Sequence, residues 1–304
     1  MKSDSPASLR RKIGSAADLQ SVVRAMKAQA AASVGQYEKA VAALGDYANS
    51  VELGLGVCFR QDAVQAASAP RHRPGAGGEI RAIVFGSDQG LVGRFNDLVV
   101  EHARGSLAEL PAIARAWAVG ERVHASLVDT DLPLLGVFPV PGSVQAIAAL
   151  VSDILVTILQ ESGDPDQPPT SIELYLYYNR PVSGSAYVPV GQRLLPLDED
   201  WQRALAGRPW PTGMLPETLG NPATTLRALI REYLFVSIFR ACSESLASEN
   251  ASRLAAMDRA DRNIDKMLAT LQDSLHRMRQ AKIDEELSDV ISGFKALGDS
   301  TRHS

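Results

Sequence analysis

The segment Arg81–Asn96, RAIVFGSDQGLVGRFN, comes nearest of any stretch to a chemical site in residue types and spacing. An apolar run leads into a glycine-rich turn, and a segment of helical character follows. This is the arrangement in which a helix N-terminus holds a phosphate group. A P-loop, however, requires a lysine followed by a hydroxyl residue, and this segment contains no lysine.

Asp88 argues against a dinucleotide site in the same turn. When the fingerprint G-x-G-x-x-G is aligned on Gly90 and Gly93, Asp88 occupies the position of its first glycine. A carboxylate there would repel a pyrophosphate, whereas aspartate is a favourable N-cap for a helix. We therefore interpret Asp88, Gly90 and Gly93 as a structural strand-to-helix turn, with nucleotide binding as the less favoured alternative.

Other reactive residue types show no spacing that indicates chemistry. The two cysteines, Cys58 and Cys242, form no C-x-x-C pair, and there is no G-x-S-x-G motif. The histidines are scattered, at His72, His102, His124, His276 and His303. We predict no catalytic residue, no cofactor and no metal site.

Composition narrows the class of protein further. The chain has 304 residues, is 45% hydrophobic and carries a formal net charge of −4, so it can bury a core and has no basic excess for nucleic acid. No run of about 18 apolar residues occurs, and the first residues, MKSDSPASLRRK, lack the apolar region of a secretory signal. We expect no nucleic-acid partner and no direct membrane insertion.

The turn lies in a region where strand and helix signals alternate. Residues 1–60 form one helical domain, with helix from about Ala7 to Phe59, and a proline- and glycine-rich linker follows at 66–78. Residues 79–215 are then predicted as an α/β domain with parallel crossovers. Its strands are RAIVFG, AIARAWAVG, SIELYLYYN and a further candidate at 182–190, and its helices are LVGRFNDLVVEHARGSL and SVQAIAALVSDILVTILQES.

Residues 222–304 are predicted to form a second long helical domain. From Met257 to Met278 apolar residues recur mainly at alternating steps of three and four, and the pattern resumes at Ile283. Because so long a helix is not stable by propensity alone, it requires a partner along its length. We predict an antiparallel coiled coil of the two ends with an inserted Rossmann-like α/β domain. The alternative is that each helix breaks and folds back into a bundle.

Three separated blocks of the sequence resemble the gamma subunit of F-type ATP synthases. The first contains LRRKI at Leu9–Ile13 and RAMK at Arg24–Lys27, and the second is SDQGLVGRFN within the opening segment. The third and strongest is ESLASENASRLAAM at Glu244–Met257, followed by RQAKI at Arg279–Ile283. A weaker match joins YYNR at 177–180 with LLPL at 194–197. The blocks follow the family's order over nearly the whole chain.

This resemblance implies a non-catalytic rotor shaft. It would couple ion-driven rotation of the membrane c-ring to conformational cycling of the catalytic beta subunits. The implied partners are the alpha and beta subunits of the catalytic hexamer, the epsilon subunit and the c-ring. The implied location is peripheral, on the cytoplasmic face of the bacterial inner membrane. Two alternatives remain open from the residues: a nucleotide-binding α/β enzyme with helical dimerisation arms, and a coiled-coil scaffold unrelated to rotation.

The resemblance also assigns contact residues. Contacts with the beta subunit are expected from Arg24, Met26, Lys27, Arg94, Glu249, Arg253, Arg279 and Gln280. Glu249 and Arg253, four apart, would form a helix ion pair contributing a few tenths of a kcal/mol if exposed. An apolar bearing tip is expected from Val290, Ile291, Phe294 and Leu297, with packing of the tip on itself as the alternative.

Several residues depart from the family's pattern. Gly14 replaces a basic residue, Arg94 a glycine and Asp284 a threonine, and Trp210–Gly213 stands near a usual strand that bears on the epsilon contact. These departures indicate a divergent bacterial branch. The transported ion is not predicted, because ion choice resides in the c-ring.

Overall fold

The computed structural model describes residues 5–65, 79–160, 172–182, 186–212, 214–217 and 221–300, excepting the side chains of 61–65, 159–160 and 293–300. The chain forms two compact units. Unit 1 comprises residues 1–29 and 255–304, and unit 2 comprises residues 30–254.

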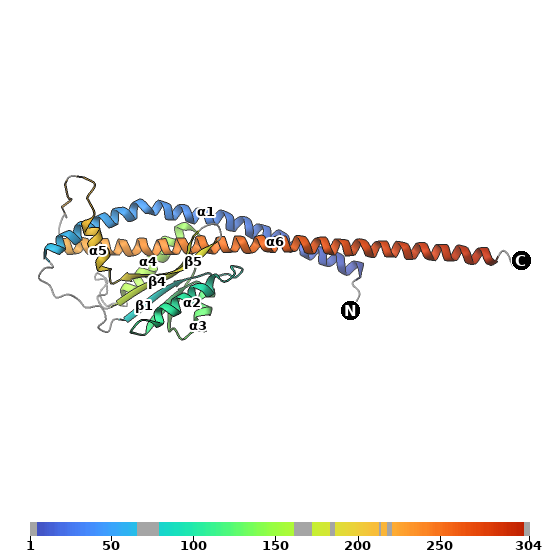
Figure 1. Ribbon diagram of the computed structural model, residues 1–304, viewed down its shortest axis with the longest axis horizontal. Coiled ribbons are helices and arrows are strands. Elements are labelled where there is room, and N and C mark those ends of the chain that lie inside the picture. Colours follow the sequence, from blue (N-terminus) through green and yellow to red (C-terminus); the bar gives the residue numbers. More distant parts are fainter. Residues whose placement is uncertain are drawn as a thin grey trace. The chain divides into compact units, whose positions relative to one another are not determined.

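Two long helices, α1 (Pro6–Gln65) and α6 (Pro222–Ser300), contribute to both units (Figure 1). In unit 1, Ala16 and Val23 of α1 form a buried cluster with Met257 and Ile264 of α6. In unit 2, Val51 and Leu55 of α1 cluster with Leu226 and Leu229 of α6. Within unit 1, Gln20 bonds Asp265 and Lys27 bonds Asp258, so residue numbers rise along α1 as they fall along α6 and the pair is antiparallel. The predicted coiled coil of the two ends is therefore confirmed.

Unit 2 also contains the α/β insert, residues 79–207. Its strands are β1 (Glu79–Phe85), β2 (Ala114–Val119), β3 (Leu134–Phe138), β4 (Ile172–Pro181) and β5 (Tyr187–Leu195). Their order in the sheet is β3-β2-β1-β4-β5, with the first four parallel and β5 antiparallel to β4. The insert's helices are α2 (Phe95–Ala108), α3 (Glu121–Val128), α4 (Val144–Gln160) and α5 (Glu199–Gly207). This is a doubly wound sheet, as predicted.

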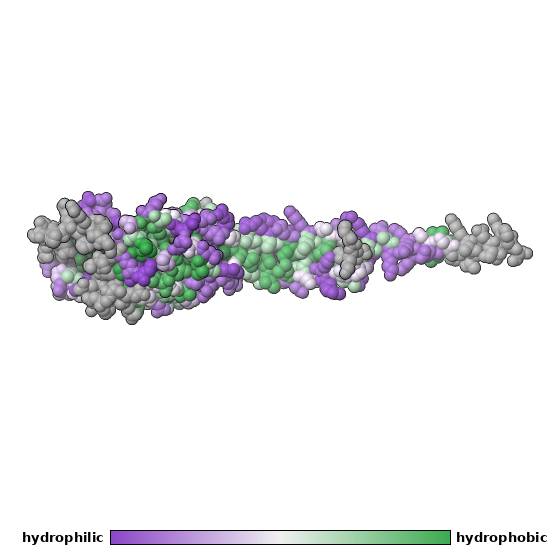
Figure 2. Space-filling model, turned by 90° about the horizontal axis from the view of Figure 1, so that it is seen from below, coloured by the Kyte–Doolittle hydropathy of each residue, from purple (hydrophilic) through white to green (hydrophobic). Residues whose placement is uncertain are grey.

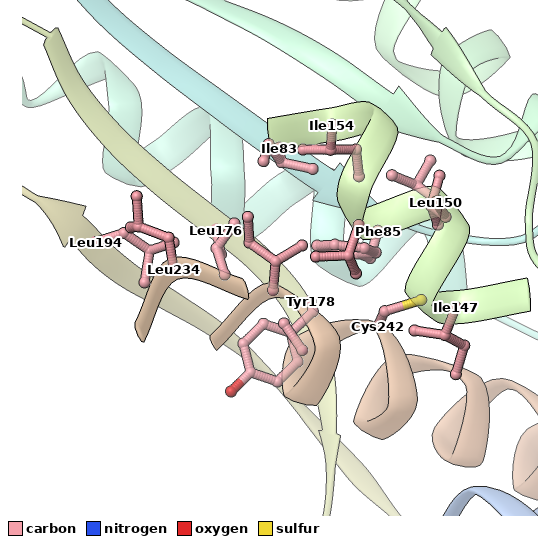
Figure 3. Packing of buried hydrophobic residues seen from close by; sticks show 14 of the residues in the cluster. Ile83, Phe85, Ile147, Leu150, Ile154, Leu176, Tyr178, Leu194, Leu234 and Cys242 are labelled. Atoms are coloured by element: carbon pink, nitrogen blue, oxygen red, sulfur yellow. The ribbon is translucent and has the colours of Figure 1, made fainter. Parts of the chain in front are cut away.

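Both faces of the sheet are covered. Ile83 and Phe85 of β1 pack on the face covered by α4 and α6, where Ile154 and Cys242 complete the core (Figure 3). The alternate residue, Val84, packs on the opposite face, against α2 and α3. Because β1 is buried on both faces, it reads as a continuous apolar run rather than an alternating one.

Sequence reasoning missed three elements and misplaced the bounds of others. β3, α3 and α5 were not predicted, α2 begins at Phe95 rather than at Leu91, and the strand expected at 182–190 is β5. Backbone at Leu91 and Gly93 explains the later start, since both have positive φ, 63° and 61°, which a right-handed helix cannot contain. Compact unit 2 extends beyond the insert, because α1 and α6 side chains complete its core.

The glycines of α1 do not all have the packing role expected of helix glycines. A Cβ added at Gly14, Gly35 or Gly45 would meet nothing within 4 Å, so no neighbouring helix approaches closely there. At Gly56, by contrast, a Cβ would lie 2.6 Å from the Leu205 carbonyl oxygen. The backbone of α5 therefore approaches α1 closely at Gly56.

Candidate interaction surfaces and the strand-to-helix turn

The turn after β1 closes on the protein itself. Gly86 begins the turn, and a Cβ there would lie 2.3 Å from the Val123 Cβ on α3. The Asn96 carboxamide oxygen accepts from the Ser87 backbone N–H at 3.0 Å, which joins the two ends of the turn. Gly93 adopts φ of 61°, a conformation that L side chains rarely adopt. These residues form a strand-to-helix turn that is closed by the protein's own groups.

Asp88 caps a different helix from the one that follows it. One carboxylate oxygen accepts from the Glu121 backbone N–H at 3.0 Å, at the start of α3, and the other accepts from Val140 N–H at 3.1 Å. The N-cap residue of α2 is Arg94, which makes no side-chain cap hydrogen bond. The expectation that Asp88 caps the next helix was therefore wrong. The carboxylate instead ties three segments of the insert together.

Protein side chains fill the region where a doubly wound sheet usually binds a ligand. That region is the crevice at the carboxyl ends of β1 and β4, where the strand order reverses. Asn179, at the end of β4, is fully buried and donates to the Phe95 carbonyl oxygen at 2.9 Å. Ser248 of α6 donates in turn to the Asn179 carbonyl oxygen at 3.0 Å. The arrangement favours packing over nucleotide binding.

Glu249 and Arg253 form a buried ion pair in unit 2. Their side chains are 6% and 12% exposed, and Arg253 Nη2 lies 2.7 Å from Glu249 Oε1. Burial raises the pKa of the Glu249 carboxyl, an effect that the Arg253 guanidinium opposes. The exposed helix pair considered from the sequence is thus not what forms. A pair enclosed in this way has little surface left for contact with another chain.

Two predicted contact residues of α1, Arg24 and Lys27, form ion pairs within unit 1. Arg24 Nε lies 3.1 Å from Asp261 Oδ1, and Lys27 forms an ion pair with Asp258. Gln20 donates to Asp261 at 3.0 Å. Met26 packs beside the buried cluster of the two helices. The Arg24 side chain remains 57% exposed, so it keeps surface available for another chain.

The remaining predicted contact residues lie on exposed surface. Arg94 pairs with Glu101 at 3.1 Å, and both side chains are more than half exposed. Arg279 and Gln280 are exposed on α6. Of the predicted tip, Val290 and Ile291 are exposed, whereas the side chains of Phe294 and Leu297 lie outside the described residues.

Sequence reasoning missed a set of paired polar residues. Asp258, Asp261 and Asp265 follow one another at steps of three and four, and Gln20, Arg24 and Lys27 at steps of four and three. On antiparallel helices these matched spacings place partners opposite one another, a signal readable in the sequence.

Among the described helices, none combines the length and apolar character needed to cross a bilayer. Within the same part of the chain, no three His, Cys, Asp or Glu side chains gather as potential metal ligands.

Comparison with known proteins identifies the family. The chain matches the ATP synthase family over residues 5–297. It is 30% identical over 307 residues to the ATP synthase gamma chain of Brucella anthropi, with 95% of this chain and 98% of that one covered. It is 28% identical over 301 residues to the gamma chain of Syntrophus aciditrophicus, with coverages of 95% and 97%.

Solved structures give the same fold. The chain resembles one from the rotor of the Euglena gracilis mitochondrial ATP synthase with a TM-score of 0.57 and 16% identity, covering 91% of this chain and 98% of that one. A chain from the central stalk and c-ring of the Tetrahymena thermophila mitochondrial enzyme gives 0.53 and 20%, with coverages of 79% and 99%. The chain therefore belongs to the ATP synthase gamma-chain family, the non-catalytic rotor subunits of the central stalk.

Proposed function

We propose that unit 1 contacts the alpha and beta subunits of the catalytic hexamer. One observation carries this proposal: every residue from Arg279 to Ser292 of α6 is exposed. The large apolar side chains among them are Ile283, Leu287, Val290 and Ile291, each between 49% and 62% exposed. Because a helix presenting apolar side chains over several turns is not stabilised by propensity alone, another chain is expected to cover it.

The helix pair of unit 1 offers a second apolar surface. Leu19 and Val22 of α1 are 52% and 57% exposed, and Met267 of α6 is 43% exposed. Figure 2 shows hydrophobic surface gathered along the helix pair; farther along α6 the surface is mostly hydrophilic, because Ile283, Leu287 and Val290 stand among charged residues. Apolar contact is non-directional and tolerates sliding, which suits a shaft that turns within a ring of subunits.

The proposed contact residues keep exposed or partly exposed surface. Arg279 and Gln280 on α6, Arg94 at the turn and Arg24 on α1 are exposed, whereas Met26 and Lys27 on α1 are partly exposed. Exposed guanidinium groups can bind a carboxylate of the beta subunit in bidentate fashion. Glu249 and Arg253 are left out of this set, because each is bound to the other in a buried position.

We assign the contacts with the epsilon subunit and the c-ring to unit 2. On this proposal the c-ring turns the insert with α1 and α6, and unit 1 then carries the beta subunits through their conformational cycle. The protein acts as a peripheral component on the cytoplasmic face of the bacterial inner membrane. Support comes from relatives that are bacterial gamma chains and from the fold shared with central-stalk chains.

Substitution of Arg279 and Gln280 by alanine tests the hexamer contact. In a complex assembled from alpha, beta and this chain, we expect the double variant to assemble normally but to hydrolyse ATP about two- to tenfold more slowly, equivalent to roughly 0.4–1.4 kcal/mol. Arg203→Ala on α5 is the matched control, because Arg203 is also an exposed arginine on a helix but lies outside the surface proposed to contact the hexamer. Unchanged turnover in the double variant would refute the contact.

A further inference from the structure

Two serines of α6, Ser248 and Ser252, bond differently from Thr270 and Ser274 of the same helix. Ser274 and Thr270 donate to carbonyl oxygens one turn back on α6 itself, at 2.8 and 2.9 Å. This is the usual arrangement for a hydroxyl within a helix. Ser248 and Ser252 instead donate outward to the insert, to the Asn179 carbonyl oxygen at 3.0 Å and the Val92 carbonyl oxygen at 2.6 Å.

A third residue continues the same stripe of α6. Glu244, four residues before Ser248, accepts from Arg180 Nε at 3.1 Å, next to Asn179 at the end of β4. Residues 244, 248 and 252 therefore lie one above another over about 12 Å of helix. Their partners belong to two separate segments of the insert, the end of β4 and the turn after β1. We call these three contacts the polar ladder.

The ladder fixes backbone positions. Both serines are buried, at 1% and 8% exposed, and their acceptors are main-chain oxygens. Asn179 extends the connection by donating to the Phe95 carbonyl oxygen at the first residue of α2. Displacing α6 would remove a hydroxyl donor from two buried carbonyl groups, which is costly; the Val92 carbonyl oxygen would keep only the longer bond from Phe95 N–H, at 3.3 Å. Hydrophobic packing alone, being non-directional, would allow small displacements at much lower cost.

The order of residues in the ladder also resists a slip by one helical turn. A slip of one turn in one direction would bring Ala256, which has no hydroxyl, to the Val92 carbonyl oxygen. A slip in the other direction would bring Glu244 to the Asn179 carbonyl oxygen. A carboxylate has no proton to donate there when ionised, so the contact would be repulsive. The ladder therefore distinguishes one register of α6 from the next.

We propose that Ser248, Ser252 and Glu244 are positioning residues that lock α6 to the insert, so that the two turn together without slip under load. This rests on the proposed function, because load reaches unit 2 only if that unit contacts the c-ring. Without the lock, α6 and the insert can shift relative to one another under load. Contact of unit 1 with the catalytic subunits is left unchanged.

The test uses the complete complex, with its membrane sector, in sealed vesicles. ATP hydrolysis and the membrane potential that it generates are measured together, the potential with a voltage-sensitive dye. For Ser248→Ala combined with Ser252→Ala we expect hydrolysis close to the parent rate but a potential per ATP hydrolysed that falls about twofold or more. Ser274→Ala, which removes a hydroxyl bonded within α6, is the matched control and is expected to leave the ratio unchanged.

Two further variants separate a lock from a merely structural role. Ser252→Thr keeps the hydroxyl donor and is expected to keep the parent ratio. Arg180→Gln weakens the exposed end of the ladder without leaving a buried carbonyl unpaired, and it serves if the double variant does not assemble; we expect it to lower the ratio. A parent-like ratio in every assembled ladder variant would overturn the lock. Failure of the parent chain to join alpha and beta subunits would instead overturn the proposed function.

Discussion

Asp88 shows how a single residue changes what a glycine-rich turn can do. Both of its oxygens are bound by backbone N–H groups, from Glu121 and Val140, so its carboxylate is held beside the turn where a phosphate would have to bind. The charge of Asp88 also contributes to the raised pKa of Glu249. An anionic ligand would therefore meet two carboxylates. The turn acts as a joint between segments of the protein.

Asp258 and Asp261 make the helix pair of unit 1 sensitive to acid. A hydrogen bond from Lys27 lowers the pKa of Asp258, and one from Gln20 lowers that of Asp261, both below the usual 3.8. Stability that depends on a lowered carboxyl pKa is present above the unfolded value and is lost as pH falls through the folded value. We therefore expect the thermal midpoint of the full chain, followed by circular dichroism, to fall between about pH 5 and pH 2.

Asp261→Asn isolates this effect, because an asparagine keeps the shape and an acceptor oxygen but does not titrate. Its thermal midpoint should depend less steeply on pH than that of the parent over the same range. Asp273→Asn, at an exposed position of the same helix, is the control and should follow the parent. Equal slopes for the parent and Asp261→Asn would show that these pairs do not stabilise the helix pair.

At the level of single elements, the glycines of α1 separate into two kinds. Gly56→Ala would place a Cβ 2.6 Å from the Leu205 carbonyl oxygen, and we expect it to lower the free energy of unfolding by about 1–3 kcal/mol. Gly45→Ala meets nothing within 4 Å, and alanine favours a helix, so we expect a gain of about 0.5–1 kcal/mol. Urea unfolding of the two variants measures both. A loss at Gly45 equal to that at Gly56 would contradict the packing difference.

Sequence reasoning predicted the elements that have either a long helical period of apolar residues or an apolar run buried on both faces. α1 and α6 repeat a helical period over many turns, and β1 is apolar on both faces. β3 was missed because, at the sheet edge, it is only partly buried, which weakens the pattern. α3 was missed because eight residues are too few for a period to be distinct. In both elements the local sequence signal is weak, and packing within the insert determines the structure.

The candidate site was predictable to a similar degree. Asp88 was recognisable as a capping residue, but its partners lie 33 and 52 residues along the chain, beyond any local pattern. The i, i+4 spacing of Glu249 and Arg253 predicted their pairing, whereas burial of the pair depends on the insert. The outward bonds of Ser248 and Ser252 likewise depend on where β4 ends.

At the scale of the whole molecule, stability is unevenly distributed. Unit 2 has a two-sided sheet and a large buried core, whereas α6 from Arg279 to Ser292 exposes every residue. A helix without a packed face opens locally far more often than one within a core. This end of α6 is therefore expected to be less stable than the core of unit 2, which fits the proposal that the catalytic subunits cover it.

Hydrogen exchange tests this dependence directly. In the isolated full-length chain, we expect the amides of residues 279–292 to exchange much faster than those of α2, where Val99 and Ala103 are fully buried. On assembly with alpha and beta subunits, exchange at 279–292 should slow by about tenfold or more, which corresponds to about 1.4 kcal/mol of added local stability. Exchange in α2 should stay the same and serves as the internal control. If 279–292 exchanged at one rate in both states, the exposed apolar side chains of α6 would not be the surface that the catalytic subunits cover.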